Sequence, residues 1–183
     1  PQSESDPAAL LLKFQIAFGS IVGDKPRIKI GPTYHPLRLF GVLVGRTAKG
    51  RKGESWGYPK QIFTSIDDLW GHKIASGLSS GEGLIWAVRD EITKNVAIKD
   101  KKTQKIQEYE KEVVDEGIKD KRLLVVESEF ASVLNVLSRD GNTLSALLRD
   151  TWDTGNLRIL TKNSPAAATG AHISIIGHIT KDE

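Results

Sequence analysis

The sequence predicts an α/β fold in which a mainly parallel central sheet is flanked by helices. Three short apolar runs indicate buried strands, at Leu37–Val44, Arg122–Val126 and Ala171–Ile176. Segments with helical patterning separate these runs, and each pair is joined by a long connection rather than a tight turn. Connections of this kind join parallel strands, because antiparallel neighbours need only a short hairpin.

The helices are predicted from capping residues and apolar spacing. The first helix begins after Ser5 or Asp6 with Pro7 in its first position, and Gly19 and Gly23 weaken and end it. Further helices are expected over Ser55 to about Ile66, Gly83–Asp90, Ala131–Arg139 and Leu144–Trp152.

Two stretches carry weaker signals. Arg27–Ile30 alternates as a short strand before a turn at Gly31-Pro32. The charged stretch 91–121 is ambiguous: Val96–Lys99 fits a strand, a lysine-rich turn follows, and either a strand or a helix comes next.

Composition narrows the possible classes of protein. The 183 residues suit one domain, and no apolar run approaches the length of about 20 residues that spans a membrane. The absence of cysteine excludes disulfides, thiol catalysis and cysteine-ligated zinc, and it fits a cytoplasmic location. Because methionine is absent even at position 1, and a charged tail follows a strong strand, we expect an excerpt of a longer protein.

A glycine-rich basic loop follows the first apolar run. A phosphate-binding loop needs glycines that let backbone N–H groups turn inward, a lysine for the phosphates, and a hydroxyl for Mg²⁺ at the start of the next helix. The segment Gly45–Ser55 contains all three, in the residues Gly45, Thr47, Lys49, Gly50, Arg51, Lys52, Gly53 and Ser55. Positions 38–60 hold six basic residues and one acidic residue, so positive charge gathers where an anion would bind.

The spacing of this loop is irregular. The standard pattern places Lys and Ser/Thr directly after the second glycine. Here Arg51 and Lys52 follow Gly50, so the loop is expanded by about three residues and Lys49 competes with Lys52 for the catalytic role. The alternative is a basic surface turn without a ligand.

Polar residues also follow the other two apolar runs. Glu127 and Glu129 come after the second run, and His178 comes after the third. Ligands bind beyond the carboxyl ends of parallel strands, so these residues are candidates for the same site. Glu127 would hold the Mg²⁺ shell together with Ser55, Glu129 would orient the attacking water, and His178 would contact the γ-phosphate. An exposed acidic turn is the alternative for the two glutamates.

Two further segments have ordinary structural explanations. Gly77–Gly83 is also glycine-rich, but it lacks a lysine and no apolar strand precedes it, so we expect Ser79 and Glu82 to form a capping box instead of a nucleotide loop. Trp152–Arg158 is a turn that could contact nucleic acid or a neighbouring subunit, and a plain hairpin is the alternative.

Several of these segments together resemble a known family. It is a domain-of-unknown-function family of P-loop proteins found in phages, plasmids and genomic islands, often beside primase modules. The similar stretches are PQSESDPAALLL, VLVGRTAKGRKGESWG, SGLSSGEGLIWAVRD, DKRLLVVESEFASVL and GNTLSALLRDTWDTGNLRILTKNSPAAATGAHISIIGHIT.

The resemblance implies a core like that of RecA and the hexameric helicases. Gly45–Ser55 would be its Walker A element, Glu127 its Walker B carboxylate, and His178 would stand near its polar sensor. The domain would then comprise a helical lead-in with short strands over 1–36 and a nucleotide-binding core over 37–183.

Two hypotheses for the function follow. The first is an ATP- and Mg²⁺-dependent, helicase-like motor or loader in mobile-element DNA replication, acting on single-stranded DNA as a homo-oligomer, a hexamer by analogy, with Arg149 or Arg158 completing a neighbour's site. The second is a degenerate P-loop module that binds DNA or a partner protein without turnover, because the loop and the acidic motif depart from the parent pattern. Lys60, Arg149, Arg158 and Lys162 would then face phosphate backbone.

Overall fold

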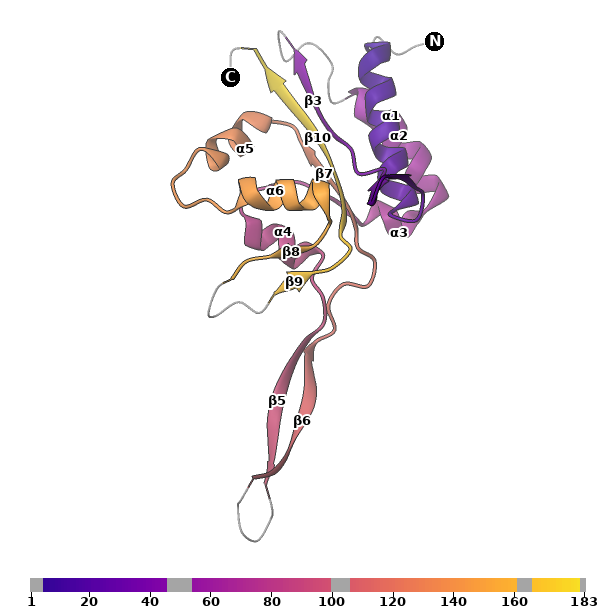
Figure 1. Ribbon diagram of the computed structural model, residues 1–183. Helices are drawn as coiled ribbons and strands as arrows, with labels where there is room; N and C mark the ends of the chain where they lie inside the picture. The colour runs from indigo at the N-terminus through magenta and orange to yellow at the C-terminus, as the bar shows by residue number, and fades with distance from the viewer. Residues whose placement is uncertain (1–4, 46–53, 100–105, 161–165, 182–183) are drawn as a thin grey trace.

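The fold is a parallel sheet with helices on both faces (Figure 1). The computed structural model describes residues 5–45, 54–99, 106–160 and 166–181. Helices α1, α2 and α3 lie on one face of the sheet, and α4, α5 and α6 lie on the other. The coarse prediction of an α/β fold is therefore confirmed.

The central sheet has the strand order β3-β10-β7-β4. Its strands are β3 (Phe40–Gly45), β4 (Ile74–Ala75), β7 (Arg122–Glu127) and β10 (His172–Thr180). All three pairings are parallel. The three apolar runs thus lie parallel in one sheet, as predicted, with the last run between the other two.

One face of the sheet is covered by α1 (Pro7–Val22), α2 (Glu54–Ile66) and the short α3 (Asp68–Gly71). Asp6 caps α1 as expected, since its Oδ1 accepts a hydrogen bond from the amide of Ala8 at 2.8 Å, and Pro7 stands in the first turn. The buried residues of this layer are Ile16, Ala17, Phe63, Trp70, Leu124 and Ile176.

The other face is covered by α4 (Gly81–Ala87), α5 (Phe130–Leu137) and α6 (Leu144–Asp153). The larger apolar cluster lies in this layer. Its sheet residues alternate with those of the first layer, because successive side chains of a strand point to opposite faces. The sheet residues of this cluster are Leu123, Val125, Ile173 and Ile175.

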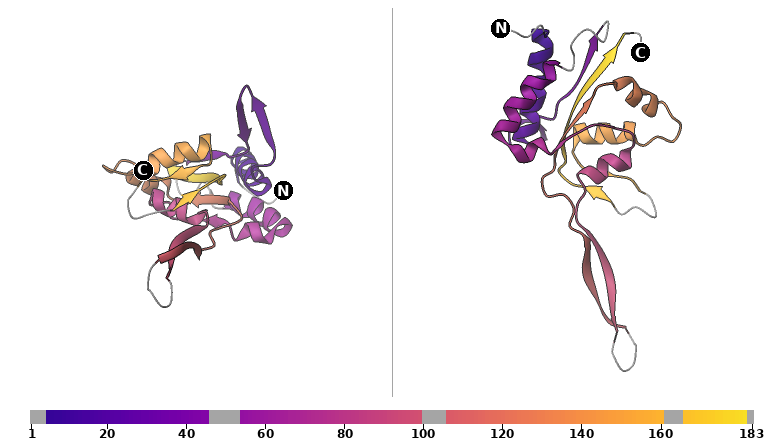
Figure 2. Two further views of the ribbon diagram at one scale, coloured as in Figure 1. Left: turned by 60° about the horizontal axis from the view of Figure 1, so that its bottom comes forward. Right: turned by 180° about the vertical axis from the view of Figure 1, so that it is seen from behind.

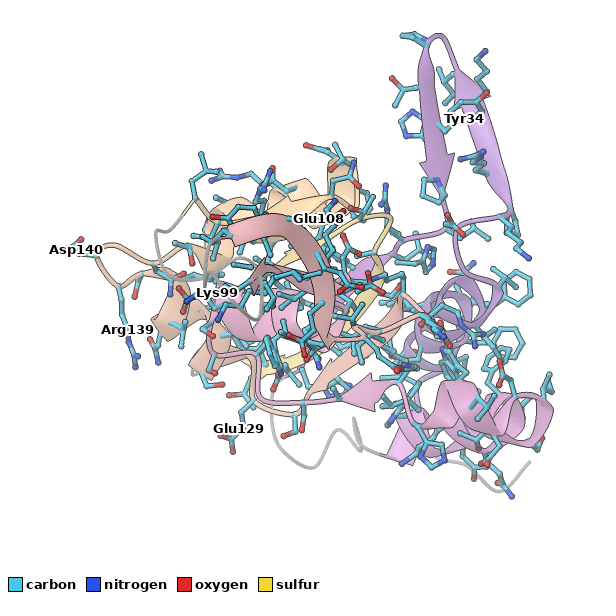
Figure 3. The ribbon with its side chains drawn as sticks, turned by 90° about the horizontal axis from the view of Figure 1, so that it is seen from below. Tyr34, Lys99, Glu108, Glu129, Arg139 and Asp140 are labelled. Carbon is cyan, nitrogen blue, oxygen red and sulfur yellow. The ribbon has the colours of Figure 1, made fainter. Side chains whose placement is uncertain are left out.

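Within the described residues, three two-stranded hairpins lie outside the sheet. They pair β1 (Arg27–Ile30) with β2 (Thr33–Pro36), β5 (Ile92–Lys99) with β6 (Ile106–Asp115), and β8 (Leu157–Arg158) with β9 (Ala167–Ala168). The ambiguous stretch is thus an antiparallel hairpin, which projects as an arm away from the body (Figures 1 and 2). Seen from below, Tyr34 marks the β1–β2 hairpin standing to one side, and Lys99 and Glu108 mark the arm (Figure 3).

Two strand predictions are corrected. The first apolar run was expected to be a buried strand over Leu37–Val44, but β3 begins at Phe40 and is an edge strand with Val44 62% exposed. Strand β10 continues to Thr180 instead of ending at Ile176, because it pairs with β3 along its second half. His178 therefore lies inside the strand rather than after it.

The helix α4 also begins differently from the prediction. Ser80, not Ser79, is its N-cap, and the Ser80 hydroxyl accepts from the amide of Gly83 at 3.0 Å. The expected Ser79–Glu82 capping box is therefore wrong by one residue, since the cap must stand three positions before the amide that it satisfies.

No helix in the described part of the chain is long and apolar enough to cross a membrane.

Candidate functional site

The candidate site lies at the carboxyl edge of the sheet. The arrowheads of β3 and β10 and the first turn of α1 point to this end of the molecule (Figure 1). The pairing register aligns Val42, Gly177 and Glu127 in one row across β3, β10 and β7. Neighbouring strands lie about 4.8 Å apart, so the backbones of Glu127 and Val42 are roughly 10 Å from each other.

The glycine-rich loop spans the gap between β3 and α2. Gly45 is the last residue of β3, where its carbonyl oxygen accepts from the amide of Lys181 at 2.9 Å. The loop residues from Arg46 to Gly53, among them Thr47, Lys49, Gly50, Arg51, Lys52 and Gly53, lie outside the described residues. What the structure places are the two ends of the loop: a parallel strand before it and a helix after it, as the motif requires.

Ser55 stands in the first turn of α2 and is buried. Its hydroxyl oxygen accepts a hydrogen bond from the Nζ of Lys13 at 2.5 Å. Lys13 is on α1, and its side chain is completely buried. An ammonium group is expensive to bury, and this hydrogen bond satisfies one of its donors. The first turn of α2 is thus tied to α1 through this buried lysine.

His178 faces the same layer. It follows Ile176 by two positions on β10, and Ile176 packs with α1 and α2, so the alternation of the strand turns His178 to that face. Its side chain is buried, and its register partner on β3 is Leu43, two residues before the loop. Ser55, Lys13 and His178 therefore share one face of the sheet at its carboxyl edge.

Glu127 faces the opposite layer. It follows Val125 by two positions, and Val125 packs with α4 to α6. The Glu127 carboxylate is buried, and its Oε1 accepts from the backbone amide of Leu78 at 2.6 Å. This hydrogen bond satisfies a buried acceptor and ties the end of β7 to the loop that precedes α4. Ser55 and Glu127 thus lie at the same edge of the sheet but belong to different faces.

The remaining candidates are exposed. Glu129 precedes α5 and makes no side-chain capping hydrogen bond, and its side chain lies at the periphery, turned outward (Figure 3). Arg149 on α6 and Arg158 on β8 are also exposed, while Lys162 lies outside the described residues. Nothing in this placement brings Glu129 next to Ser55, and its assignment to the attacking water stays a prediction.

Sequence reasoning missed two features of this edge. Lys13 interrupts an apolar helical run, and this interruption was the signal that could have indicated its buried contact with another element. The second feature is the segment 76–80, for which the sequence showed no preceding strand. The short strand β4 does precede it and pairs in parallel with β7, so this segment lies at the carboxyl edge beside Glu127.

The space beneath that segment is small. A cavity of about 140 Å³ is lined by Ala75–Ser80, Gly83, Leu84, Ala87, Leu123 and Val125. Sites for small molecules occupy roughly 300–1,000 Å³, so this cavity is too small for a nucleotide. The prediction that Gly77–Gly83 makes no contact with nucleotide remains compatible with this geometry.

Comparison with known proteins adds no family to these observations. No family model matches the chain, and no curated protein is significantly similar to it. Within the described residues, no cluster of three or more histidine, aspartate or glutamate side chains has the geometry of a metal site.

Proposed function

We propose that this chain is an ATP-binding, RecA-like P-loop domain of the helicase type that acts in mobile-element DNA replication in the cytoplasm. One observation carries the proposal. A parallel strand, a glycine-rich loop of phosphate-binding composition, and a helix starting with a buried serine follow one another at the carboxyl edge of the sheet. Ligands of α/β proteins bind at this edge, and phosphates favour the N-terminus of a helix.

The strand order supports the same proposal. Only β10 separates the strand before the loop from the strand ending in Glu127, so their carboxyl ends lie at the same edge of the sheet although 82 positions separate Gly45 from Glu127 in sequence. We propose that ATP is the ligand, that Ser55 binds Mg²⁺, and that Glu127 acts on the Mg²⁺ shell through water. A homo-oligomer and single-stranded DNA are part of the same proposal.

A second candidate is a module that binds the triphosphate or DNA without turnover. Two observations favour it: Glu127 is engaged with the amide of Leu78, and it belongs to the sheet face opposite that of Ser55. Hydrolysis needs a carboxylate or another base close to the attacking water. In this form of the site, the loop and α2 would retain phosphate affinity while the acidic motif stabilises the fold.

Calorimetry with ATP, with and without Mg²⁺, tests the shared part of both candidates. Replacing Lys49 and Lys52 together by alanine should abolish ATP binding, and unchanged affinity would contradict the assignment of the loop. Phosphate release measured with and without single-stranded DNA then separates the candidates. Turnover that single-stranded DNA stimulates supports the motor, whereas tight binding without turnover supports the second candidate.

A further inference from the structure

A groove at the amino edge of the sheet lies between the β1–β2 hairpin and the end of α6. Its volume is about 400 Å³, within the range of roughly 300–1,000 Å³ that is typical of small-molecule sites. One wall comes from the residues that lead into β3, and the other comes from 152–154 at the end of α6. The groove is therefore at the edge opposite the glycine-rich loop, which follows β3.

Arg38 lines this groove with a buried positive charge. The residue is only 7% exposed, and its Nη2 and Nη1 donate to the carbonyl oxygens of Asp153 and Ala171 at 3.3 Å and 3.4 Å, which are long for hydrogen bonds. Within the described residues its Nε has no hydrogen-bond partner. Burial lowers the pKa of Arg38, and the charges of Asp24 and Asp153 offset this only in part. A guanidinium in these surroundings favours an anion in the groove.

Trp152 adds an open aromatic surface to the same groove. Its indole packs edge-to-face against the ring of Phe40, with the ring centroids 5.2 Å apart, and the residue remains 48% exposed. An indole that is held by one neighbour and open to solvent can serve as a platform on which a nucleobase stacks.

The β1–β2 hairpin adds two cations beside the groove. The guanidinium of Arg27 lies 4.4 Å from the centroid of the Tyr34 ring, and the Nζ of Lys29 lies 5.5 Å from it. All three residues are exposed, and the ring of Tyr34 lines the groove (Figure 3). Asp153 is the acidic residue in the lining, so the cations Arg27, Lys29 and Arg38 outweigh it.

We propose that this groove binds single-stranded DNA, with a base stacked on Trp152 and the adjoining phosphates on Arg27 and Lys29. The inference rests on the proposed function and deepens it, since it names the surface that holds that partner. Cations beside an aromatic platform suit single strands, because their bases are free to stack on the protein. A duplex keeps its bases stacked on each other, and a mononucleotide lacks a backbone that presents a phosphate to each cation.

The stacking contact is tested by fluorescence anisotropy with a labelled oligothymidylate, and circular dichroism confirms the fold of each variant. Trp152→Leu removes the platform. Trp86→Leu is the matched control, because Trp86 is 52% exposed, has the guanidinium of Arg89 at 3.9 Å from its ring, and lies on α4 outside the groove. We expect Trp152→Leu to weaken binding by about fivefold or more, and Trp86→Leu to change it by less than about twofold.

The phosphate contacts are tested by the salt dependence of the same binding. Each phosphate neutralised on a single strand contributes about 0.7 to the slope of log affinity against log salt, so Arg27→Gln with Lys29→Gln should reduce the slope by about 1.4. Lys94→Gln with Lys111→Gln is the control, because both lysines are exposed on the arm and the net charge changes equally. An equal reduction in the control would show that the charge acts from anywhere on the surface, which overturns the inference.

The outcomes separate the inference from the proposed function. Wild-type protein that binds no oligothymidylate refutes single-stranded DNA as a partner and the inference with it, whereas binding that persists within twofold in a folded Trp152→Leu refutes the groove alone. Equal affinity for thymidine monophosphate or for duplex DNA also refutes the groove as a site for single strands. If Trp152→Leu does not fold, an oligonucleotide that contains iodouracil is crosslinked to wild type by ultraviolet light. Mass spectrometry should then find the crosslink at Trp152 or Tyr34, and crosslinks confined to other residues overturn the inference.

Discussion

Gly177 offers a quantitative test of the packing at the carboxyl edge. It lies in the row of Glu127, and a Cβ atom added there would stand 2.6 Å and 2.8 Å from two ring atoms of Phe130. Ordinary contacts of a Cβ begin near 3.4 Å, so the ring would have to retreat by roughly 0.8 Å. The backbone at Gly177 does not have a positive φ, so alanine meets no conformational obstacle.

Two opposing effects set the magnitude for Gly177→Ala. Alanine in place of glycine within a strand gains about 0.5–1 kcal/mol, whereas overpacking costs about 1–3 kcal/mol. The displacement needed here is large, and Phe130 in the first turn of α5 packs against the buried core, so we expect a net loss of about 1–2 kcal/mol. Urea denaturation followed by tryptophan fluorescence measures this loss.

Two further variants isolate the cause of that loss. In a Phe130→Ala background the obstacle is gone, and Gly177→Ala should stabilise the protein by about 0.5–1 kcal/mol. Gly57→Ala in α2 is the control, because a Cβ there meets nothing within 4 Å and should only gain helix propensity. A neutral Gly177→Ala in wild type, or the same loss in the Phe130→Ala background, would refute the packing described here.

Three other changes have defined outcomes. Ser80→Ala should cost about 1 kcal/mol in urea denaturation, because the cap of α4 is lost, whereas Ser79→Ala should be nearly neutral. Burial lowers the pKa of His172, whose Nε2 lies 2.8 Å from the carbonyl oxygen of Gly19, so the folded protein keeps this ring neutral. The unfolded chain then binds more protons below about pH 6.5, stability falls as the pH falls through that value by up to about 1.4 kcal/mol per unit, and His172→Gln should remove that slope. Replacing 93–113 by a short glycine-serine turn should leave thermal unfolding of the body unchanged, since none of the arm residues that the structure describes joins either apolar cluster. A large drop in the melting temperature would show that the arm supports the body.

The sheet could be predicted because its strands carry a signal of their own. Arg122–Val126 lies between two neighbours and two helical layers, and such strands need apolar residues on both faces. The parallel direction of this strand could be predicted from the long connections alone. The edge position of β3 was beyond prediction, because a run of apolar residues indicates burial but not which neighbours provide it, and Val42 and Val44 remain partly open to solvent.

The site was harder to predict than the sheet. The sequence places Glu127 at a strand end, but which face it takes depends on a count of one residue along β7, and an error of one residue reverses the face. The strand β4 has two residues, which are too few for any periodic signal. The sequence therefore did not indicate that the segment 76–80 lies at the carboxyl edge of the sheet. Lys13 was visible only as an exception within an apolar helix, and its partner Ser55 is distant in sequence.

The separation of the two faces leads to a prediction about how binding and turnover divide. Ser55 and Lys13 lie on the face of α1 and α2, whereas the Glu127 carboxylate is held by Leu78 on the face of α4. A phosphate bound next to Ser55 would therefore lie on the face of α1 and α2 and would reach Glu127 only across the strand ends. Glu127→Gln keeps an oxygen that accepts from the Leu78 amide and removes only the charge, so it preserves the tie to the loop that precedes α4. We expect this variant to bind ATP within about twofold of wild type and to lose turnover by about a hundredfold or more, the range expected for loss of one group that stabilises the transition state electrostatically. Calorimetry and phosphate release measured on the same sample test both expectations. A loss of ATP affinity of about tenfold or more would show that the carboxylate contributes directly to triphosphate binding and that the two faces form one compact site.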